Sequence, residues 1–177
     1  MPNWSPFLIA EPGEKIPAPR AIATVEGVGD RMRVAAFAEL MAIEAFGWAA
    51  ITYTDASEDL KTAWRELARE EKNHHDWLIK RMSELSLDLR ERKVSDRLWF
   101  SFLGCKTAKD FSLYMATAEY RGKIAGERVA EQLKDSDPES SRVFAKIAFE
   151  EIRHIDHVIK FYPDLKAEFI SRVQNRE

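Results

Sequence analysis

The chain has 177 residues, and its 45% hydrophobic and 32% charged content is ordinary for one soluble globular domain. A net charge of −3 and a pI near 5.9 leave no basic excess, so the composition does not support a nucleic-acid partner. The single cysteine, Cys105, excludes an intramolecular disulfide, and no apolar run approaches the roughly 20 residues that span a bilayer. Because nothing at the start of the chain resembles a signal sequence, we expect a cytoplasmic protein with no membrane partner.

Residues 1–29 form the first predicted segment, a proline-rich arm. They hold five of the seven prolines, namely Pro2, Pro6, Pro12, Pro17 and Pro19. Proline removes backbone donors and favours extended chain. The apolar side chains of Trp4, Phe7, Leu8 and Ile9 favour packing of this arm on the body of the protein or on a neighbouring subunit. A disordered leader is the alternative.

Four later segments carry the apolar periodicity of bundle helices. Their stripes are Met32, Ala35, Glu39, Ile43, Phe46 and Ala50; then Leu60, Trp64, Leu67, Glu71, His74, Leu78 and Met82; then Ala108, Phe111, Met115, Glu119, Gly122, Gly126, Val129 and Leu133; and finally Phe144, Ile147, Glu151, His154, Val158 and Phe161. The expected fold class is therefore all-α, an antiparallel four-helix bundle over residues 30–162. The first helix is apolar on its opposite side too, so we expect it to be buried almost all round.

The connections between these helices differ in length. Asp55 or Ser57 could cap the second helix. Residues 84–107 exceed an ordinary helix-helix loop, which predicts a long crossover between the second and third helices, with a small helix after a cap at Ser95. On the third helix, Gly122 and Gly126 indicate either close approach of another backbone or room left beside a site. Residues 163–177 are expected to form a short helix or tail.

The second and fourth stripes each contain a Glu-x-x-His pair at their centre. In a helix, residues three apart lie on one face, one turn apart. Glu71 with His74, and Glu151 with His154, are such pairs, and they stand 80 residues apart (151 − 71). The same offset relates six residues in all, and these are the predicted metal ligands: Glu39, Glu71, His74, Glu119, Glu151 and His154.

Four glutamates in apolar stripes require partners, because burying an unpaired carboxylate costs several kcal/mol. Four carboxylates and two imidazoles match two divalent cations, and this mixed oxygen and nitrogen set suits iron or manganese. We expect two metal ions, Fe/Fe first, with Fe/Mn or Mn/Mn as alternatives. Glu71 and Glu151 are expected to bridge the ions, Glu39 and Glu119 to be terminal ligands, and each histidine to bind one ion.

Nearby residues compete for these roles, namely Glu44, His75, Glu127 and His157. Glu44 lies about 140° around the helix from Glu39 and is the alternative first-helix ligand. His75 could replace His74 by pairing with Glu71 at i+4, although it leaves the stripe. Glu127 breaks both the stripe and the 80-residue offset. His157 is either an outer residue that holds a ligand by a hydrogen bond or a half-exposed surface histidine.

One glutamate from each of two helices plus a Glu-x-x-His pair from each of the other two is the ligand arrangement of ferritin-like di-iron bundles. Residues 38–44, 70–74, 118–122 and 150–154 resemble the ligand helices of these proteins. Within them the chain is most similar to a bacterial ferritin-like family related to tRNA hydroxylases that act on a prenylated adenosine. The resemblance covers about residues 31–162 and implies a di-iron or iron-manganese oxidase fold.

Three functions follow as hypotheses. The first is a dinuclear oxidase or oxygenase that activates dioxygen to oxidise a small-molecule or modified-base substrate, with an electron-donor protein and a homodimer as compatible partners. The second is a ferroxidase, an iron-handling or storage protein of the ferritin type. The third is a non-enzymatic bundle that keeps the ligands for stability or partner binding.

Overall fold

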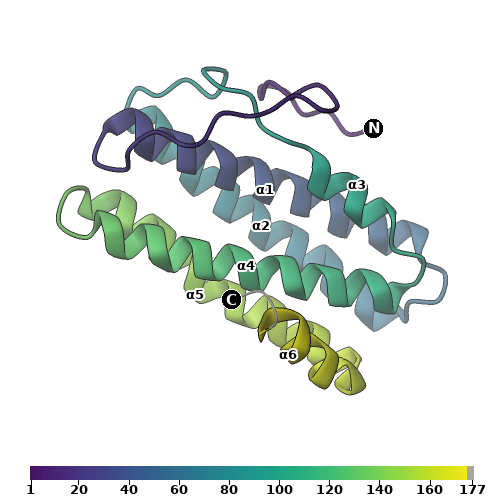
Figure 1. Cartoon of the computed structure of the whole chain (residues 1–177). Coiled ribbons are helices and arrows are strands. Elements are labelled where there is room, and N and C mark those ends of the chain that lie inside the picture. The colour runs from purple at the N-terminus through teal and green to yellow at the C-terminus, as the bar shows by residue number, and fades with distance from the viewer. Residues whose placement is uncertain (175–177) are drawn as a thin grey trace.

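A computed structural model of the chain describes residues 1–174, except for the side chain of Val158, which the fourth predicted stripe includes. The elements in chain order are α1 (Val25–Thr52), α2 (Glu58–Glu84), α3 (Arg97–Leu103), α4 (Ala108–Leu133), α5 (Pro138–Phe161), the 3-10 turn η1 (Pro163–Leu165) and α6 (Lys166–Gln174) (Figure 1). Residues 1–174 contain no β-strand, and a single parallel bridge joins Ile9 to Val94. The described chain is therefore all-helical, as predicted.

Side-chain caps fix the start of three long helices. The hydroxyls of Thr24, Ser57 and Thr107 each accept a hydrogen bond from the backbone N–H three residues later, at 3.0, 3.2 and 3.0 Å. Of the two predicted caps for α2, Ser57 is the one used. Asp55 instead accepts a hydrogen bond from the backbone N–H of Ala108 at 3.0 Å, and so links the start of α4 to the turn before α2.

The first helix begins five residues earlier than predicted. It starts at Val25 rather than Asp30, so the arm comprises residues 1–24 rather than 1–29. Gly27 and Gly29 lower the helix propensity of this first turn, which is why the sequence pattern places the start later. The Thr24 cap and the burial of this turn against the rest of the protein outweigh that local preference.

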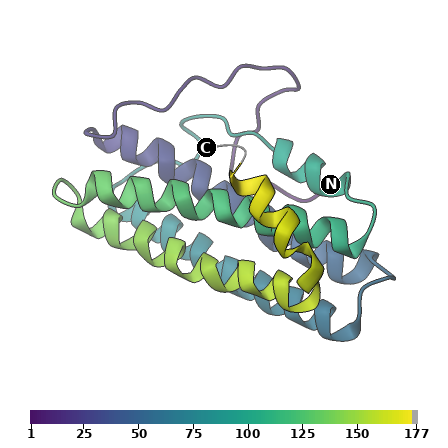
Figure 2. The ribbon, with the colours of Figure 1, turned by 60° about the horizontal axis from the view of Figure 1, so that its bottom comes forward.

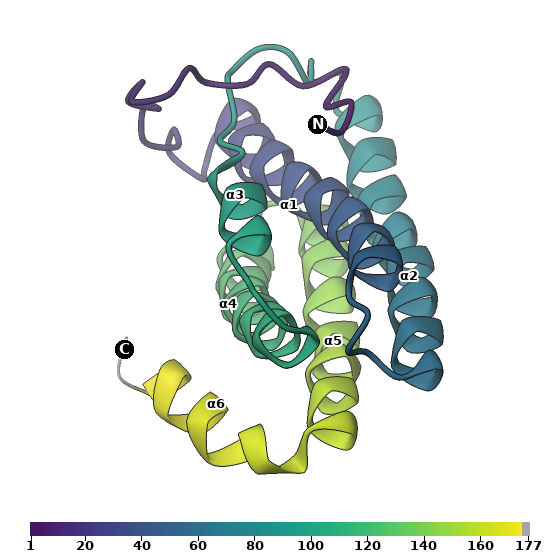
Figure 3. The ribbon, with the colours of Figure 1, turned by 90° about the vertical axis from the view of Figure 1, so that its right-hand side faces the viewer.

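The four long helices lie in two pairs. α1 packs along α2 and α4 packs along α5, whereas α1 and α4 touch over only a short stretch (Figure 3). The core between them contains large side chains that are almost fully buried, among them Met32, Phe46, Trp64, Leu78, Phe111, Met115 and Leu133. Each such side chain stabilises the fold by about 1.5–3 kcal/mol. The pairing leaves a cavity between α1 and α4.

The prediction that α1 is buried almost all round needs correction. Phe37 and Met41, on the side away from the ligand stripe, are buried, but Val34 is 56% exposed and Ile51 is 84% exposed. Contrary to the expectation that no apolar segment approaches the length of a bilayer span, α1 is apolar and long enough to cross a membrane by length and composition alone. That is weak evidence for a span, because a buried core helix has the same composition, and α1 is packed into the core.

The arm lies on the body of the protein, as the first of its two predicted alternatives states. Trp4 is buried against Phe37 and Trp99, with ring centroids 5.4 and 5.6 Å away. The backbone N–H of Val94 donates to the carbonyl of Leu8 at 2.8 Å. The arm is thereby fixed to both α1 and the crossover.

A buried ionic network holds the arm, the start of α1 and the crossover together. Asp30 is 4% exposed and accepts hydrogen bonds from Arg20 of the arm, from Arg33 one turn along α1 and from Arg92 of the crossover. Arg33 is 1% exposed and also pairs with Glu91 at 3.0 Å. Burial by itself raises the pKa of Asp30, but the hydrogen bonds from Arg20 and the charge of Arg92 outweigh it and lower that pKa below its usual value.

The crossover and the chain end complete the fold. Within the crossover, Trp99 and Phe102 of the short helix α3 are buried. Asp96 occupies the N-cap position but makes no side-chain capping bond, whereas the hydroxyl of Ser95, the predicted cap, accepts a hydrogen bond from the backbone N–H of Arg97 at 3.3 Å. After α5, the chain turns through η1 and α6 packs along α4, where Phe169 is buried (Figure 2). The predicted C-terminal helix is therefore present, and residues 175–177 of that predicted segment lie outside the described residues.

Candidate metal centre

The six predicted ligands come together in the middle of the four long helices. Each stands on a stripe that faces the other helices, so folding the stripes inward places the six polar groups in one apolar interior. α2 and α5 each contribute a Glu-x-x-His pair, and α1 and α4 contribute one glutamate each: Glu39, Glu71, His74, Glu119, Glu151 and His154. All are buried except Glu39, whose side chain is 12% exposed.

The ligand atoms form two overlapping groups, and within each group they lie within 4.8 Å of one another. One group comprises Glu39, Glu71, His74 and Glu151, and the other comprises Glu71, Glu119, Glu151 and His154. The carboxylates of Glu71 and Glu151 belong to both groups. Each group could therefore hold one ion, and the two shared carboxylates could serve both ions.

The imidazoles face the shared carboxylates through Nδ1. Nδ1 of His74 lies 3.2 Å from Glu71 and 3.3 Å from Glu151, and Nδ1 of His154 lies 2.7 Å from Glu71 and 3.3 Å from Glu151. The two rings are stacked, with centroids 5.5 Å apart and an interplanar angle of 20°. The same nitrogen of each ring is therefore directed into the centre.

Four buried atoms of this centre make no hydrogen bond of acceptable geometry within the protein, although two of them, His154 Nδ1 and Glu71 Oε1, lie 2.7 Å apart. They are Glu71 Oε1, Glu119 Oε1, Glu151 Oε2 and His154 Nδ1. Buried polar atoms are nearly always satisfied, and leaving one unsatisfied costs about 1–3 kcal/mol. Because these atoms converge and are all metal-ligand types, the residues present fit a pair of divalent ions better than they fit any pairing among themselves.

Without a metal ion, protons bound by the glutamates and histidines balance the negative charge of this centre. Burial and the negative charges of Glu71 and Glu151 raise the pKa of Glu39, and burial and the charge of Glu151 raise the pKa of Glu119. Burial opposes the charged histidines, but the neighbouring carboxylates outweigh it and raise the pKa of His74 to about 10 and that of His154 to about 11.

We predict that metal binding releases protons and weakens as the pH falls. At pH 7 both histidines lie below their raised pKa values and are protonated, and a metal ion requires their neutral form. Calorimetric titration with Mn²⁺ in buffers of different ionisation enthalpy should therefore show release of at least two protons per chain. Equal affinity at pH 6 and pH 8, with no proton release, would contradict this.

Two outer carboxylates that the sequence interpretation missed hold the far side of each imidazole. Nε2 of His74 lies 3.1 Å from Glu150, and Nε2 of His154 lies 3.0 Å from Glu70. A proton held at Nε2 leaves Nδ1 free as a ligand. Glu70 also pairs with Arg153, whereas Glu150 pairs with no arginine or lysine among residues 1–174, so the two halves are not equivalent. The 80-residue offset relates Glu70 to Glu150 as well and could have revealed them.

Removing Glu150 should weaken metal binding without removing a ligand. Outer carboxylates that orient a histidine typically change metal affinity by about 10–100-fold, so we expect a loss of that size for Glu150→Ala at the ion held by His74. Mn²⁺ titration followed by electron paramagnetic resonance measures it. Asp156→Ala, which removes an exposed carboxylate from the same helix, is the matched control and should bind like the wild type.

The rival residues lie outside the centre. Glu44 is exposed, and Glu127 is exposed and pairs with Lys123 at 2.7 Å. His75 faces Asp76 and the ring of Phe7. His157 is half-buried and stacks on Phe161, with ring centroids 6.0 Å apart. Of the open alternatives, the structure brings Glu39 rather than Glu44, and His74 rather than His75, into the cluster.

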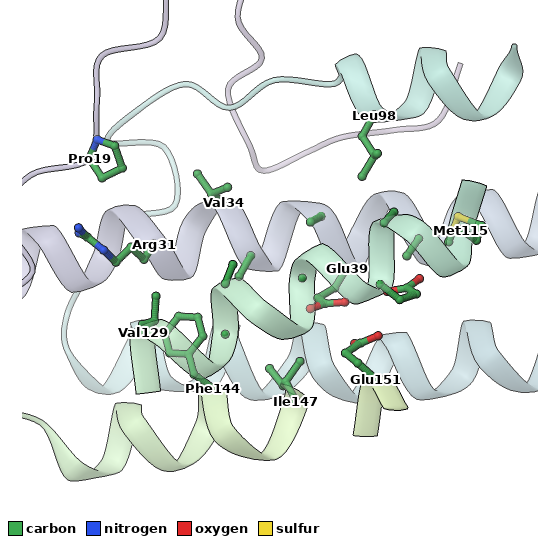
Figure 4. Close-up of a pocket in the computed structure, with 18 of the residues that line it drawn as sticks. Pro19, Arg31, Val34, Glu39, Leu98, Met115, Val129, Phe144, Ile147 and Glu151 are labelled. Carbon is green, nitrogen blue, oxygen red and sulfur yellow. The ribbon is translucent and has the colours of Figure 1, made fainter. Parts of the chain in front are cut away.

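A cavity of about 300 Å³ leads away from the centre between α1 and α4. Pro19 and Arg31 line one end of it, the carboxylates of Glu39 and Glu151 lie further along, and Met115 lies beyond them (Figure 4). Glu119 also lines the cavity. Gly122 lines the space in between, and a Cβ built on it meets nothing within 4 Å. Gly126 differs, because its Cβ would lie 3.3 Å from that of Ala148 on α5. Of the two alternatives predicted for these glycines, room beside the site therefore applies to Gly122, and close approach of another helix applies to Gly126.

The fold has a solved counterpart. A dodecameric thioferritin, the bacterioferritin-related protein from Bacteroides fragilis, superposes with a TM-score of 0.66 at 20% sequence identity, over 84% of this chain and 91% of that one. This likeness establishes a ferritin-like fold. No curated protein sequence matches the chain, and none of the comparisons bears on the expected relation to tRNA hydroxylases.

A family model covers almost the whole chain. It matches residues 2–171, which include the arm, all six cluster residues and most of α6. The match extends well beyond the four long helices, so the arm and the C-terminal helix are part of what the family shares. The chain belongs to the family described as "Protein of unknown function (DUF455)".

Proposed function

We propose that the protein is a dinuclear metal oxidase or oxygenase that uses dioxygen to oxidise an organic substrate. The observation that carries the proposal is the pair of overlapping ligand groups joined by Glu71 and Glu151, next to an apolar cavity. In this proposal Glu39 and His74 complete one ion site, and Glu119 and His154 complete the other. Iron in both sites is the first choice, with Fe/Mn and Mn/Mn as alternatives.

The protein's own groups have separate tasks in this reaction. When bound, the metal pair supplies the redox chemistry by which dioxygen is reduced. Glu70 and Glu150 keep the imidazole protons at Nε2, and the buried core around the carboxylates limits access of bulk water. For hydroxylation, a C–H bond becomes C–OH, the second oxygen atom leaves as water, and two electrons and two protons come from an electron-donor protein.

The direct test is anaerobic loading with ferrous iron followed by a pulse of dioxygen. We expect two tightly retained iron ions per chain and oxygen consumption in proportion to that iron. His154→Ala removes a ligand from one ion site and should lower both the retained iron and the oxygen consumption. Retention of only weak, sub-stoichiometric iron by the wild type would contradict the proposal. The expected relation to tRNA hydroxylases, a homodimeric state and a cytoplasmic location remain parts of this proposal.

Ferroxidation is the second candidate, and the fold of the thioferritin favours it. A ferroxidase turns over ferrous iron as substrate, so repeated additions of iron would each consume dioxygen and build a ferric product. An oxygenase stops after its two resident ions react unless a reductant is added. Iron storage also requires a large shell, so a monomer or dimer in size-exclusion chromatography would exclude the storage form of this candidate.

A further inference from the structure

The cavity beside the metal centre follows α1 for several turns, from Asp30 to Ala42. Within it, Arg31 and Glu39 are eight residues apart, which corresponds to about 12 Å along the helix axis. On α4 it extends from Met115 to Val129, and Phe144 of α5 closes the side near Arg31 (Figure 4). An extended ligand that lies along α1 from Arg31 would reach the carboxylates of the centre.

Small side chains on two facing helices create this space. The residues are Ala35, Ala38 and Ala42 on α1, and Ala118, Gly122 and Ala125 on α4. Larger side chains at these positions would fill the space between α1 and α4. Apart from the carboxylates of the centre, Asp30 and Arg31, the lining is apolar, so the cavity favours a chain of CH₂ or CH₃ groups over a polar ligand.

Arg31 gives the outer end a positive charge. Its Nη1 donates to the carbonyls of Arg20 and Gly27 at 2.9 and 2.7 Å, which fixes the guanidinium at the mouth. Among residues 1–174 it forms no ion pair with a carboxylate. Asp30, which also lines the mouth, is already neutralised by Arg20, Arg33 and Arg92. The charge of Arg31 is therefore available to an anionic group on a ligand.

We propose that this cavity binds an apolar chain with one anionic end, a carboxylate or a phosphate. The anion pairs with Arg31, and the chain extends between α1 and α4 so that its distal carbons reach Glu39 and Glu151. This inference rests on the proposed function in taking such a chain as the substrate, and it assigns the site of oxidation to carbons far from the anion. The arm has a defined role here, because its Arg20 carbonyl positions Arg31.

Binding is tested by calorimetry with decanoate, decyl phosphate and decanol, chosen because an extended decyl chain is of the order of the 12 Å that separate Arg31 from Glu39 along α1. We expect saturable binding of one ligand per chain, weaker for hexanoate than for decanoate. Tighter binding of decanoate would identify a carboxylate as the natural end group, and tighter binding of decyl phosphate would identify a phosphate. Binding of decanol alone would overturn the anionic part of the proposal.

Three variants locate the ligand. Gly122→Leu should fold, because its Cβ has open space, and should raise the Kd for decanoate at least tenfold by filling the cavity. Gly47→Leu is the matched control, since Gly47 of α1 also has open space around its Cβ but does not line the cavity. Arg31→Gln should raise the Kd for decanoate about tenfold and leave that for decanol unchanged. Ala38→Leu replaces Gly122→Leu should the latter not fold.

The outcomes separate this inference from the proposed function. Equal binding of decanoate to the wild type and to Gly122→Leu, or only non-saturable binding, would overturn the inference even in a protein that retains two iron ions. Saturable binding sensitive to Gly122→Leu and Arg31→Gln, in a protein that does not retain iron, would support the cavity assignment and contradict the oxidase. Because the readout is ligand affinity, no activity of the loaded protein is needed.

Discussion

Glu71→Ala is expected to abolish tight binding of both metal ions. Glu71 is fully buried and belongs to both ligand groups, so its loss removes one ligand from each ion at once. We expect the affinity to fall by more than the roughly 100-fold that an outer carboxylate can cost. Anaerobic titration with Fe²⁺ or Mn²⁺, followed by desalting and metal analysis, should give two ions per chain for the wild type and close to none for the variant.

Thermal unfolding provides a second measurement of the same loss. An ion present at a thousandfold excess over its Kd stabilises the folded protein by about 4 kcal/mol. For a chain of this size that corresponds to a rise in Tm of the order of 10 °C, which Glu71→Ala should not show. Glu66→Ala removes an exposed carboxylate from the same helix and should bind metal normally. Two retained ions in Glu71→Ala would contradict the assignment of this residue as a shared ligand.

Asp30→Asn is expected to cost about 3–5 kcal/mol of stability, the range for breaking a buried ion pair by removing one partner. The variant leaves the guanidinium of Arg33, which is 1% exposed, without its carboxylate one turn away. It also removes the acceptor that joins Arg20 of the arm to Arg92 of the crossover. Urea unfolding of the metal-free protein at pH 7 measures the loss. Wild type and variant are compared with the same m value, the slope of the unfolding free energy against urea concentration.

The pH dependence of this loss has a defined sign. A carboxylate whose pKa is lowered by folding stabilises the protein above its unfolded pKa near 4, and that contribution disappears as the pH falls through the lower folded value. The difference in the free energy of unfolding between wild type and Asp30→Asn should therefore stay constant from pH 7 to about pH 4 and decrease only below pH 4. Asp164→Asn, which removes an exposed partner of Lys109, should cost less than about 1 kcal/mol. Equal losses for the two variants would contradict the structural role of Asp30.

The apolar periodicity of the helices and the 80-residue offset between the two halves predicted most of the metal centre. Glu39, Glu71 and His74 each stand at the middle of an apolar stripe, and the 80-residue repeat supplies the second half of the cluster. These relations are visible without coordinates, because helix geometry fixes which residues share a face. The choice of Glu39 over Glu44 follows from the same rule, and the structure places Glu39 in the cluster and Glu44 on the surface.

Other features of this site depend on contacts between segments far apart in the chain. Glu150 contacts His74 across the α2–α5 contact, and Arg153 contacts Glu70 in the same way. No local sequence pattern therefore predicts the difference between Glu70, which pairs with an arginine, and Glu150, which pairs with none among the described residues. The cavity likewise depends on how closely α1 and α4 pack, which the small side chains allow but do not specify.

The sequence by itself determined the helical class, the four ligand stripes and the six residues that meet in the core, because each depends on the regular spacing of side chains along a helix. Tertiary structure decided where α1 begins, since burial of its first turn and the Thr24 cap outweighed the low propensity of two glycines. It also decided that the arm lies on the body, and that Arg31 stands at the mouth of an apolar cavity. These depend on packing between distant segments, which no local pattern encodes.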